Sequence, residues 1–432
     1  MVAAVGCGDE GAPAPRVIGT ELATCDITTS PCQRGIYESV AESLDASGYS
    51  MPSIRTISVD QHADEVRSGL DLEDLTGEDA ATRGLRLLGF IPEASESLTA
   101  TQAEYWITQV AAYYSRSSNR ITVIDRNYEQ GAAQVLLAHE FIHSIQNSQF
   151  DLGTVGRGVD TEDGVIGVRS VIEGDAVHSS FAWYYDVSGY APEDIDWDEI
   201  HDERTARLRD RVADPERALI DTASSFPYSY GFQLMTNTSL AEGLLGRAAA
   251  FEAPPATTLE VLLGYGAQAP VVDFPLEAHP SPVEGNEVAE ENRYGAWYVY
   301  GFLRRHGVED EEAWTTGLSW VGDELAIYDD GAEVAAVWRV RFDDQAKAEL
   351  LSAEVNGEGG DDARSAVAFG EDAFVFAAES AETLLAWAEQ PLDTMTASII
   401  AKSARPKGGA VSVGTCLQSH DFSVPMPPPI LR

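Results

Sequence analysis

Lysine is scarce in this sequence, and so is positive charge in general. The chain of 432 residues has three lysines, and its 28 Lys and Arg residues stand against 71 Asp and Glu residues, for a formal net charge of −43. So acidic a chain repels phosphates, which argues against a nucleic acid or an anionic membrane surface as a partner. Because the acidic residues are spread along the whole chain, we interpret them as a strongly hydrated surface. The alternative reading is attraction of cationic substrates or divalent ions.

Long apolar runs are also absent, since no segment reaches the length of about 20 residues that a membrane-spanning helix needs. The first residues are small and apolar and lead to Ala-Val-Gly-Cys7, which resembles the lipobox of bacterial lipoproteins. They lack a basic segment, and the apolar part is short for a signal peptide. The resemblance implies a lipid anchor at Cys7 and a protein that is secreted or held in the cell envelope.

Cysteine is rare, with four residues in the chain. No CxxC pair occurs, which argues against a zinc ribbon. Cys25 and Cys32 flank a short loop and can form a disulfide with each other, or either can pair with Cys416. If Cys7 carries a lipid, one thiol is left over, and the sequence leaves the connectivity open.

Apolar periodicity predicts an α+β protein. We expect a mainly helical core with a small sheet, followed by an additional α+β region. The predicted division is a flexible leader (1–35), an N-terminal α/β segment that packs on the core (36–98), the core (99–265), a Pro- and acid-rich linker or loop (266–292), a C-terminal α+β region (293–420) and a tail (421–432).

The core contains the motif LLAHEFIHSIQ, residues 136–146, within a predicted helix over about 130–149. On a helix, His139 and His143 share one face and can bind the same metal ion. Glu140 points about 100° away, where it is badly placed as a ligand and well placed to take a proton from water on the metal. The flanking residues are apolar, so two histidines without partners would be costly there. We therefore predict an HExxH zinc site in preference to two surface histidines on an ordinary helix.

A third ligand is predicted on the next apolar helix, expected over 168–189. Gln146 and Gln149 stand where a metzincin has its Gly and third His, which excludes that class. Glu173 lies 30 residues after His143, and a loop between the two helices can bring it to the histidine pair. His₂Glu is a known catalytic zinc combination.

Other residues compete with Glu173 for this position. Asp175 lies about 200° around the helix from Glu173, so we expect it to orient a ligand histidine from outside the ligand set. His178 is read as a satisfied helical histidine, with a ligand or oxyanion donor as the alternative. Glu162 and Asp163 fall in a predicted polar loop over 151–166, where carboxylates are usually solvated.

The sequence HEFIHSIQ followed by EGDA resembles the gluzincins, zinc peptidases with HExxH and a downstream Glu. Other stretches, among them QVAAYYSRSSNRITVID and FPYSYG, resemble a group of mostly uncharacterised, secreted or lipid-anchored zincin-like proteins over roughly residues 51–345. The resemblance implies zinc bound by His139, His143 and Glu173, with Glu140 as the base. It also implies a strand, here RITVID, that pairs with an extended peptide substrate; an interior strand is the alternative.

Gluzincins use a Tyr or His to bind the developing oxyanion. Tyr228 and Tyr230 in FPYSYG are the candidates, and ordinary core aromatics are the alternative. We therefore expect a zinc-dependent peptidase that acts on a peptide or protein. A non-catalytic zincin-like surface lipoprotein, acting as a binding or scaffold protein, is the alternative, and an acidic lipoprotein without metal is a third reading. The sequence does not indicate an oligomeric state.

Overall fold

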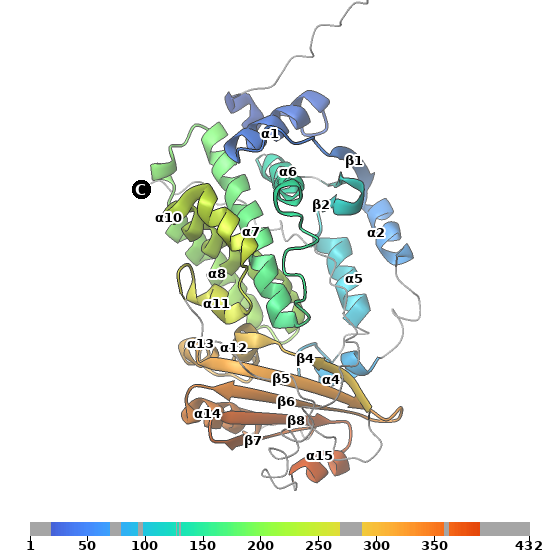
Figure 1. Ribbon diagram of the computed structural model, residues 1–432. Coiled ribbons are helices and arrows are strands. Elements are labelled where there is room, and N and C mark those ends of the chain that lie inside the picture. Colours follow the sequence, from blue (N-terminus) through green and yellow to red (C-terminus); the bar gives the residue numbers. More distant parts are fainter. Residues whose placement is uncertain are drawn as a thin grey trace, which may run out of the picture.

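A computed structural model gives the fold. It describes residues 19–69, 79–93, 98–126, 128, 131–267, 287–357 and 363–388. The predicted lipid site Cys7, the leftover Cys416 and the predicted tail lie outside these residues. Figure 1 shows a mainly helical half with a small sheet, and a second half built on a five-stranded sheet. The predicted α+β class is confirmed. Among the described residues, no helix is long and apolar enough to cross a membrane.

The small sheet has the strand order β1-β3-β2. Strand β3 (Arg120–Asp125) pairs in parallel with β1 (Ser53–Ser58) and antiparallel with β2 (Ala112–Ser115). The suggestion that RITVID pairs with substrate is therefore wrong, because β3 is the central strand and its neighbours use both of its edges. Its β-branched residues are buried, as expected for an interior strand. Within the described part of the chain, no further strand pairs with the outer edge of β2.

The HExxH segment forms α6 (Ala132–Phe150), which packs between α1 (Ser30–Ser43), β2 and α7 (Glu162–Val187). The helix begins after Gly131, whose φ of 90° favours glycine. A Cβ there would lie 2.4 Å from the Tyr184 hydroxyl of α7, so glycine also permits the close contact between the two helices.

The second site helix, α7, starts earlier than the sequence suggested. Thr161 caps it by accepting a hydrogen bond from the Gly164 amide at 3.2 Å, so Glu162 and Asp163 belong to its first turn. The prediction of a loop up to residue 166 was wrong. Acidic residues are common in a first helical turn because they complement the helix dipole.

The middle of α7 lies directly against the start of α10 (Tyr230–Glu252). A Cβ on Gly174 would lie 2.2 Å from the Gly231 carbonyl oxygen, and one on Gly231 would lie 2.5 Å from the Ser170 carbonyl oxygen. These two glycines therefore let the helix backbones touch. The contact places the turn before α10, η4 (Phe226–Tyr228), beside Glu173.

Other elements complete the helical half. They are η1 (Gly19–Ala23), α2 (Val59–Ser68), α5 (Leu98–Gln109), η2 (Arg116–Ser118), η3 (Pro192–Asp194), α8 (Trp197–Val212), α9 (Leu219–Ser225) and α11 (Thr258–Leu263). Cys25 and Cys32 form a disulfide between η1 and α1, which decides between the pairings left open by the sequence. The Cys25 carbonyl accepts a hydrogen bond at 2.7 Å from Gln134 in the first turn of α6.

The second half is an antiparallel sheet in the order β4-β5-β6-β8-β7. Its strands are β4 (Glu287–Asn292), β5 (Trp320–Asp329), β6 (Val334–Phe342), β7 (Arg364–Phe369) and β8 (Asp372–Ala378). Its helices are α12 (Gly295–Arg305), α13 (Asp310–Leu318), α14 (Gln345–Val355) and α15 (Ala381–Ala388). The last part of the predicted linker is therefore an edge strand, β4.

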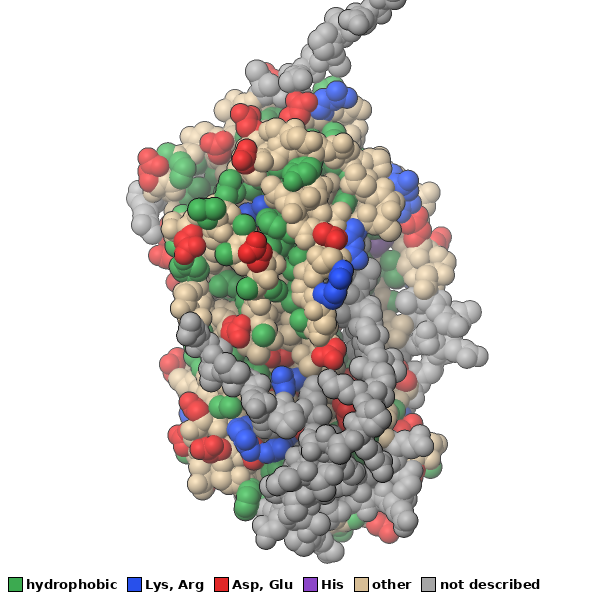
Figure 2. Space-filling view, viewed as in Figure 1, with side chains coloured by type: hydrophobic (Ala, Val, Ile, Leu, Met, Phe, Trp, Pro, Cys, Tyr) green, Lys and Arg blue, Asp and Glu red, His purple; other side chains and the backbone are tan. Residues whose placement is uncertain are grey.

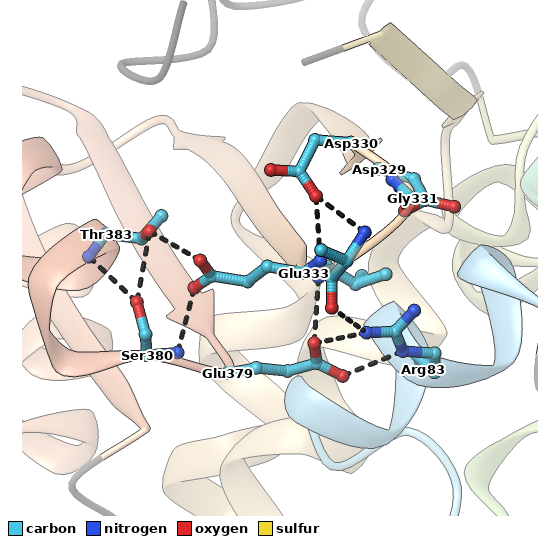
Figure 3. Close-up of polar contacts among 10 residues, drawn as sticks. Arg83, Asp329, Asp330, Gly331, Glu333, Glu379, Ser380 and Thr383 are labelled. Atoms are coloured by element: carbon cyan, nitrogen blue, oxygen red, sulfur yellow. Dashed lines mark hydrogen bonds and ion pairs between the residues drawn. The ribbon is translucent and has the colours of Figure 1, made fainter. Parts of the chain in front are cut away.

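Helix α4 (Ala80–Leu87) belongs to this second half, although the sequence suggested that 36–98 packs on the core as one segment. A Cβ on Gly84 would lie 2.6 Å from Ile327 in β5, so α4 lies close against the sheet. Arg83 donates from Nε to Glu379 Oε1 at 2.8 Å, and Glu379 also accepts from the Val334 amide at 2.9 Å (Figure 3).

The five-stranded half also contains a saturated buried carboxylate, Asp323 in β5. Its Oδ1 accepts hydrogen bonds from the Gly295 amide (2.8 Å) and the Trp320 indole (3.0 Å). Its Oδ2 accepts from the Tyr294 amide and the Trp338 indole, both at 2.9 Å. Asp323 therefore ties the start of α12 to the sheet. On the visible surface, Asp and Glu side chains are scattered over both halves (Figure 2).

Candidate metal centre

Helices α6 and α7 bring the three predicted ligands together. The Nε2 atoms of His139 and His143 lie 3.0 Å apart, and Glu173 Oε2 lies 3.4 Å from the first and 3.2 Å from the second. All three side chains are buried, with exposed fractions of 0, 6 and 1%. Among the described residues, these three side chains form the one group of His, Cys, Asp or Glu whose ligand atoms lie close enough together to hold a metal ion.

The spacing of these atoms fits a tetrahedral ion. Ligand atoms about 2.0–2.2 Å from a tetrahedral zinc stand about 3.3–3.6 Å from one another, and the observed separations come within a few tenths of an ångström of that range. Two imidazoles and one carboxylate are a donor set that zinc prefers. The site can therefore hold a divalent metal ion, and its donor types favour zinc.

The neighbours of His143 favour its protonated form when no ion is bound. Burial works to lower the pKa of His143, but the charge of Glu173 and its hydrogen bond raise that pKa to about 9, with a further contribution from Glu140. Metal binding would have to displace this proton, because only a neutral imidazole nitrogen is a ligand.

A chain of hydrogen bonds orients His143 from behind. His143 donates from Nδ1 to Gln146 Oε1 at 2.8 Å, which leaves Nε2 directed at the other ligands. Gln146 Nε2 donates to Asp175 Oδ2 at 2.7 Å, and Asp175 is ion-paired with buried Arg247 at 2.8 Å. Asp175 thus acts on the ligand through Gln146. In the sequence, Gln146 served only to exclude a metzincin, although its position one turn after His143 was a usable signal.

Glu140 is fully buried beside the ligands without belonging to their group. Its charge reaches His143 and also Tyr128, whose pKa burial raises to about 12 with a smaller contribution from Glu140. The Tyr128 hydroxyl donates to the Ala111 carbonyl oxygen at 2.9 Å, directly before β2. Glu140 therefore lies within electrostatic reach of both the ligands and the end of the β2–β3 pair.

The two candidate tyrosines lie in different places. The Tyr228 ring stacks on His139 with centroids 6.3 Å apart, and its phenol is hydrogen-bonded to Glu173. Burial, and secondarily the Glu173 charge, raise the pKa of Tyr228 well above its usual value, so it is a protonated donor. Tyr230 instead packs against Trp297 of α12 and Trp314 of α13. The structure thus brings Tyr228 to the site and places Tyr230 elsewhere.

The remaining competitors lie outside the ligand group. The Thr236 hydroxyl bridges His178 Nδ1 at 3.1 Å and His201 Nε2 at 3.2 Å, so His178 is satisfied in the core. Asp163 is buried, not solvated, and its Oδ1 accepts hydrogen bonds from the backbone and hydroxyl of Thr258. Glu162 lies in the same first turn of α7.

Sequence reasoning missed one charged residue near the ligands. Arg169 precedes Glu173 by one helical turn on α7 and is buried. Burial works against its charge, but Tyr228 and Glu173 raise its pKa, followed by smaller contributions from Tyr105 and Glu162. A buried guanidinium beside the ligands offsets their negative charge, and its i−4 spacing from Glu173 was the available signal.

Compared with known proteins, the chain matches no family model, no curated protein and no solved structure. The gluzincin resemblance therefore rests on the motif residues and stays a prediction.

Proposed function

We propose that this chain is a zinc-dependent peptidase in which His139, His143 and Glu173 hold the ion. The observation that carries the proposal is a buried His₂Glu set with a second acidic side chain, Glu140, adjacent to it and outside it. A zinc ion bound there would supply Lewis acidity, which polarises a carbonyl and lowers the pKa of water towards about 7.

The protein's own residues supply the proton transfers. Glu140 accepts a proton from the attacking water and passes it to the leaving amine. Tyr228 is held next to the ligands with its hydroxyl protonated, so it can donate a hydrogen bond to the negative charge that develops on the carbonyl oxygen. In the present arrangement that hydroxyl is bonded to Glu173, and this bond must be exchanged when substrate enters.

Strand β2 is the candidate for holding an extended peptide. It is an edge strand, it packs against α6, and its neighbour β3 runs antiparallel to it. An edge strand offers backbone donors and acceptors that a peptide can pair with in register. The sequence suggested β3 for pairing with substrate. Because β3 is the central strand, we assign that pairing to β2 instead.

Burial of the whole centre favours a second candidate function, a metal-bound scaffold without turnover. Glu140 is 0% exposed and each ligand is at most 6% exposed. Structural zinc sites are closed, whereas catalytic ones keep a position open to water. In this second reading the metal would cross-link α6 to α7, and the protein would act by binding.

Metal analysis combined with one substitution tests both. Protein purified without added metal should contain about one zinc per chain and cleave casein or a peptide library. Glu140→Gln should retain the zinc and lose about 10²-fold or more of the hydrolysis, because the general base is gone. Glu199→Gln, an exposed change on α8, is the matched control.

The outcomes separate the readings. Hydrolysis by Glu140→Gln at the wild-type rate, or loss of zinc from that variant, contradicts the role given to Glu140. Zinc without any hydrolysis supports the scaffold. Absence of metal from folded protein removes the basis of both.

A further inference from the structure

A pocket of about 210 Å³ lies between α5 and the segment from α8 to α9. Pockets that enclose whole small ligands have volumes of about 300–1,000 Å³, so this one has room for a single side chain. Its charged and polar lining includes Glu104 and Tyr105 from α5, Arg211 from α8, Arg217, and Asp221 and Ser225 from α9.

Two connections place the pocket near the ligands. Ser225 is followed directly by η4, which ends at Tyr228. Three residues span at most about 10 Å of chain, and the Tyr228 phenol is hydrogen-bonded to Glu173. On the opposite wall, Tyr105 lies within electrostatic reach of both Tyr228 and Arg169. The pocket is therefore connected to the metal centre along η4 on one wall and through Tyr105 on the other.

Two carboxylates, of Glu104 and Asp221, and two guanidiniums, of Arg211 and Arg217, line the pocket. Among the described residues, neither the Glu104 nor the Asp221 carboxylate makes a hydrogen bond or an ion pair. Arg217 already pairs with Asp214, from Nε to Oδ2 at 3.4 Å. Burial raises the pKa of Asp221 to about 6, against the lowering influence of Arg217 and Arg305. Glu104 adds a smaller raising contribution, so the two carboxylates lie within electrostatic reach of each other. Asp221 is mostly ionised at pH 7 and largely buried.

We propose that this pocket is a specificity subsite for a basic side chain, Lys or Arg, of a peptide substrate. The cationic group would pair with Asp221 at the α9 wall and with Glu104 at the α5 wall. The Tyr105 ring and the stem of the substrate side chain would provide the apolar contact between them. The peptide part rests on the proposed function, whereas recognition of the cation rests on the pocket alone.

Binding of a small probe tests the pocket without any turnover. N-acetyl-L-argininamide and N-acetyl-L-norleucinamide are titrated into wild-type protein and followed by calorimetry at low salt. We expect the arginine probe to bind more tightly than the norleucine probe. Asp221→Asn should weaken it by about tenfold or more, since hydrogen bonds to a charged partner have that value. Glu104→Gln lies on a different helix and should weaken it less.

The control variant is Glu216→Gln, an exposed carboxylate before α9 that does not line the pocket, and it should bind the arginine probe as wild type does. Equal binding of the two probes, or unchanged binding of the arginine probe to both pocket variants, overturns the subsite.

A second arm uses matched peptides that differ only in Lys or norleucine. The ratio of their kcat/KM values should exceed one and fall about tenfold in Asp221→Asn. If no peptide is cleaved but the arginine probe still responds to Asp221→Asn, the proposed peptidase fails and the cation pocket stands. If peptides are cleaved without preference for Lys and the probes do not discriminate, the pocket fails and the peptidase stands.

Discussion

The two halves of the molecule bury carboxylates in opposite ways. In the five-stranded half, Asp323 accepts four hydrogen bonds, from backbone amides at the start of α12 and from indoles in its own strand β5 and in β6. In the helical half, Glu173 converges with His139 and His143, so that three ligand atoms point at one another. Burial of an acidic group is therefore no mark of function by itself.

The direction of the neighbouring groups is the informative difference. Donors from surrounding backbone and side chains stabilise an anion and use up its lone pairs, as at Asp323. Side chains that all have lone pairs to offer, held 3.0–3.4 Å apart, are arranged for a cation at their centre. The first arrangement stabilises the fold. The second places lone pairs close to one another, and this repulsion is offset only by a bound ion or a proton.

Removing Asp323 is the largest test of this difference. Asp323→Ala leaves two indole N–H groups and two backbone amides without an acceptor, and should lower the free energy of unfolding by at least about 3 kcal/mol. Urea denaturation measures the loss, and metal analysis of the remaining folded protein should show unchanged zinc. A loss below about 1 kcal/mol, or a folded variant without metal, would break the distinction between the halves.

Acid should destabilise the helical half through its buried neutral histidines. Burial lowers the pKa of His178 to about 4, despite Asp175 nearby, and that of His201 to about 3. The imidazoles of His178 and His201 share the Thr236 hydroxyl and pack on Trp197, and both are neutral in the fold. In the unfolded chain the same side chains protonate near pH 6.5. The free energy of unfolding is therefore unaffected by these histidines above about pH 6.5 and decreases as the pH falls below that value. For His178 the decrease is about 3 kcal/mol at pH 4.

His178→Gln isolates this effect, because glutamine can bond Thr236 and does not titrate. Urea denaturation of metal-free wild type and variant, from pH 7 to pH 5, should show a shallower decline for the variant. Metal-free protein is used because His143 would otherwise couple metal release to the same pH range. Parallel curves for the two proteins would show that His178 is protonated in the fold.

Gln146 tests whether the hydrogen bonds behind the ligands matter to the metal. Gln146→Leu removes the acceptor of His143 Nδ1 and the link to Asp175, and should weaken zinc binding by about 10–100-fold. Competition with a chromophoric chelator measures the affinity. Gln149→Leu is the matched control, since Gln149 bonds Arg247 and the Leu44 carbonyl, not a ligand histidine. Equal losses in both variants would assign the effect to packing.

Local sequence signals predicted the parts of this protein that local physics decides. The i, i+4 spacing of His139 and His143 and the apolar helix around Glu173 were enough to identify three side chains that could hold a metal ion, because helix periodicity fixes which side chains share a face. Tyr228 and Tyr230 could not be separated in the same way. They lie in different helical elements, and the close contact between Gly174 and Gly231, which brings η4 to α7, joins helices far apart in the sequence.

Long-range pairing explains the other differences. Strand β4 lies in a Pro- and acid-rich region, and it is a strand because β5 offers an edge to it. The central place of β3 depends on β1, which is more than 60 residues away in the sequence. Helix α4 joins the five-stranded half through Ile327 and Glu379, which no pattern near residue 84 can reveal.

The smallest expected effect concerns that last contact, and it sharpens the comparison between charge pairs in the two halves. Arg83 and Glu379 are paired at the end of the sheet (Figure 3). Their side chains are 19 and 33% exposed, whereas those of Arg247 and Asp175, behind the metal centre, are 6 and 3% exposed. An exposed pair contributes about 0–1 kcal/mol because water and salt screen it. Arg83→Gln should therefore change the free energy of unfolding by at most about 1 kcal/mol, measured by urea denaturation, and less at 1 M salt. A larger decrease in the free energy of unfolding that does not depend on salt would show that a desolvated ion pair holds α4 to the sheet. The ion pairs of the two halves would then differ in their geometry and not in their strength.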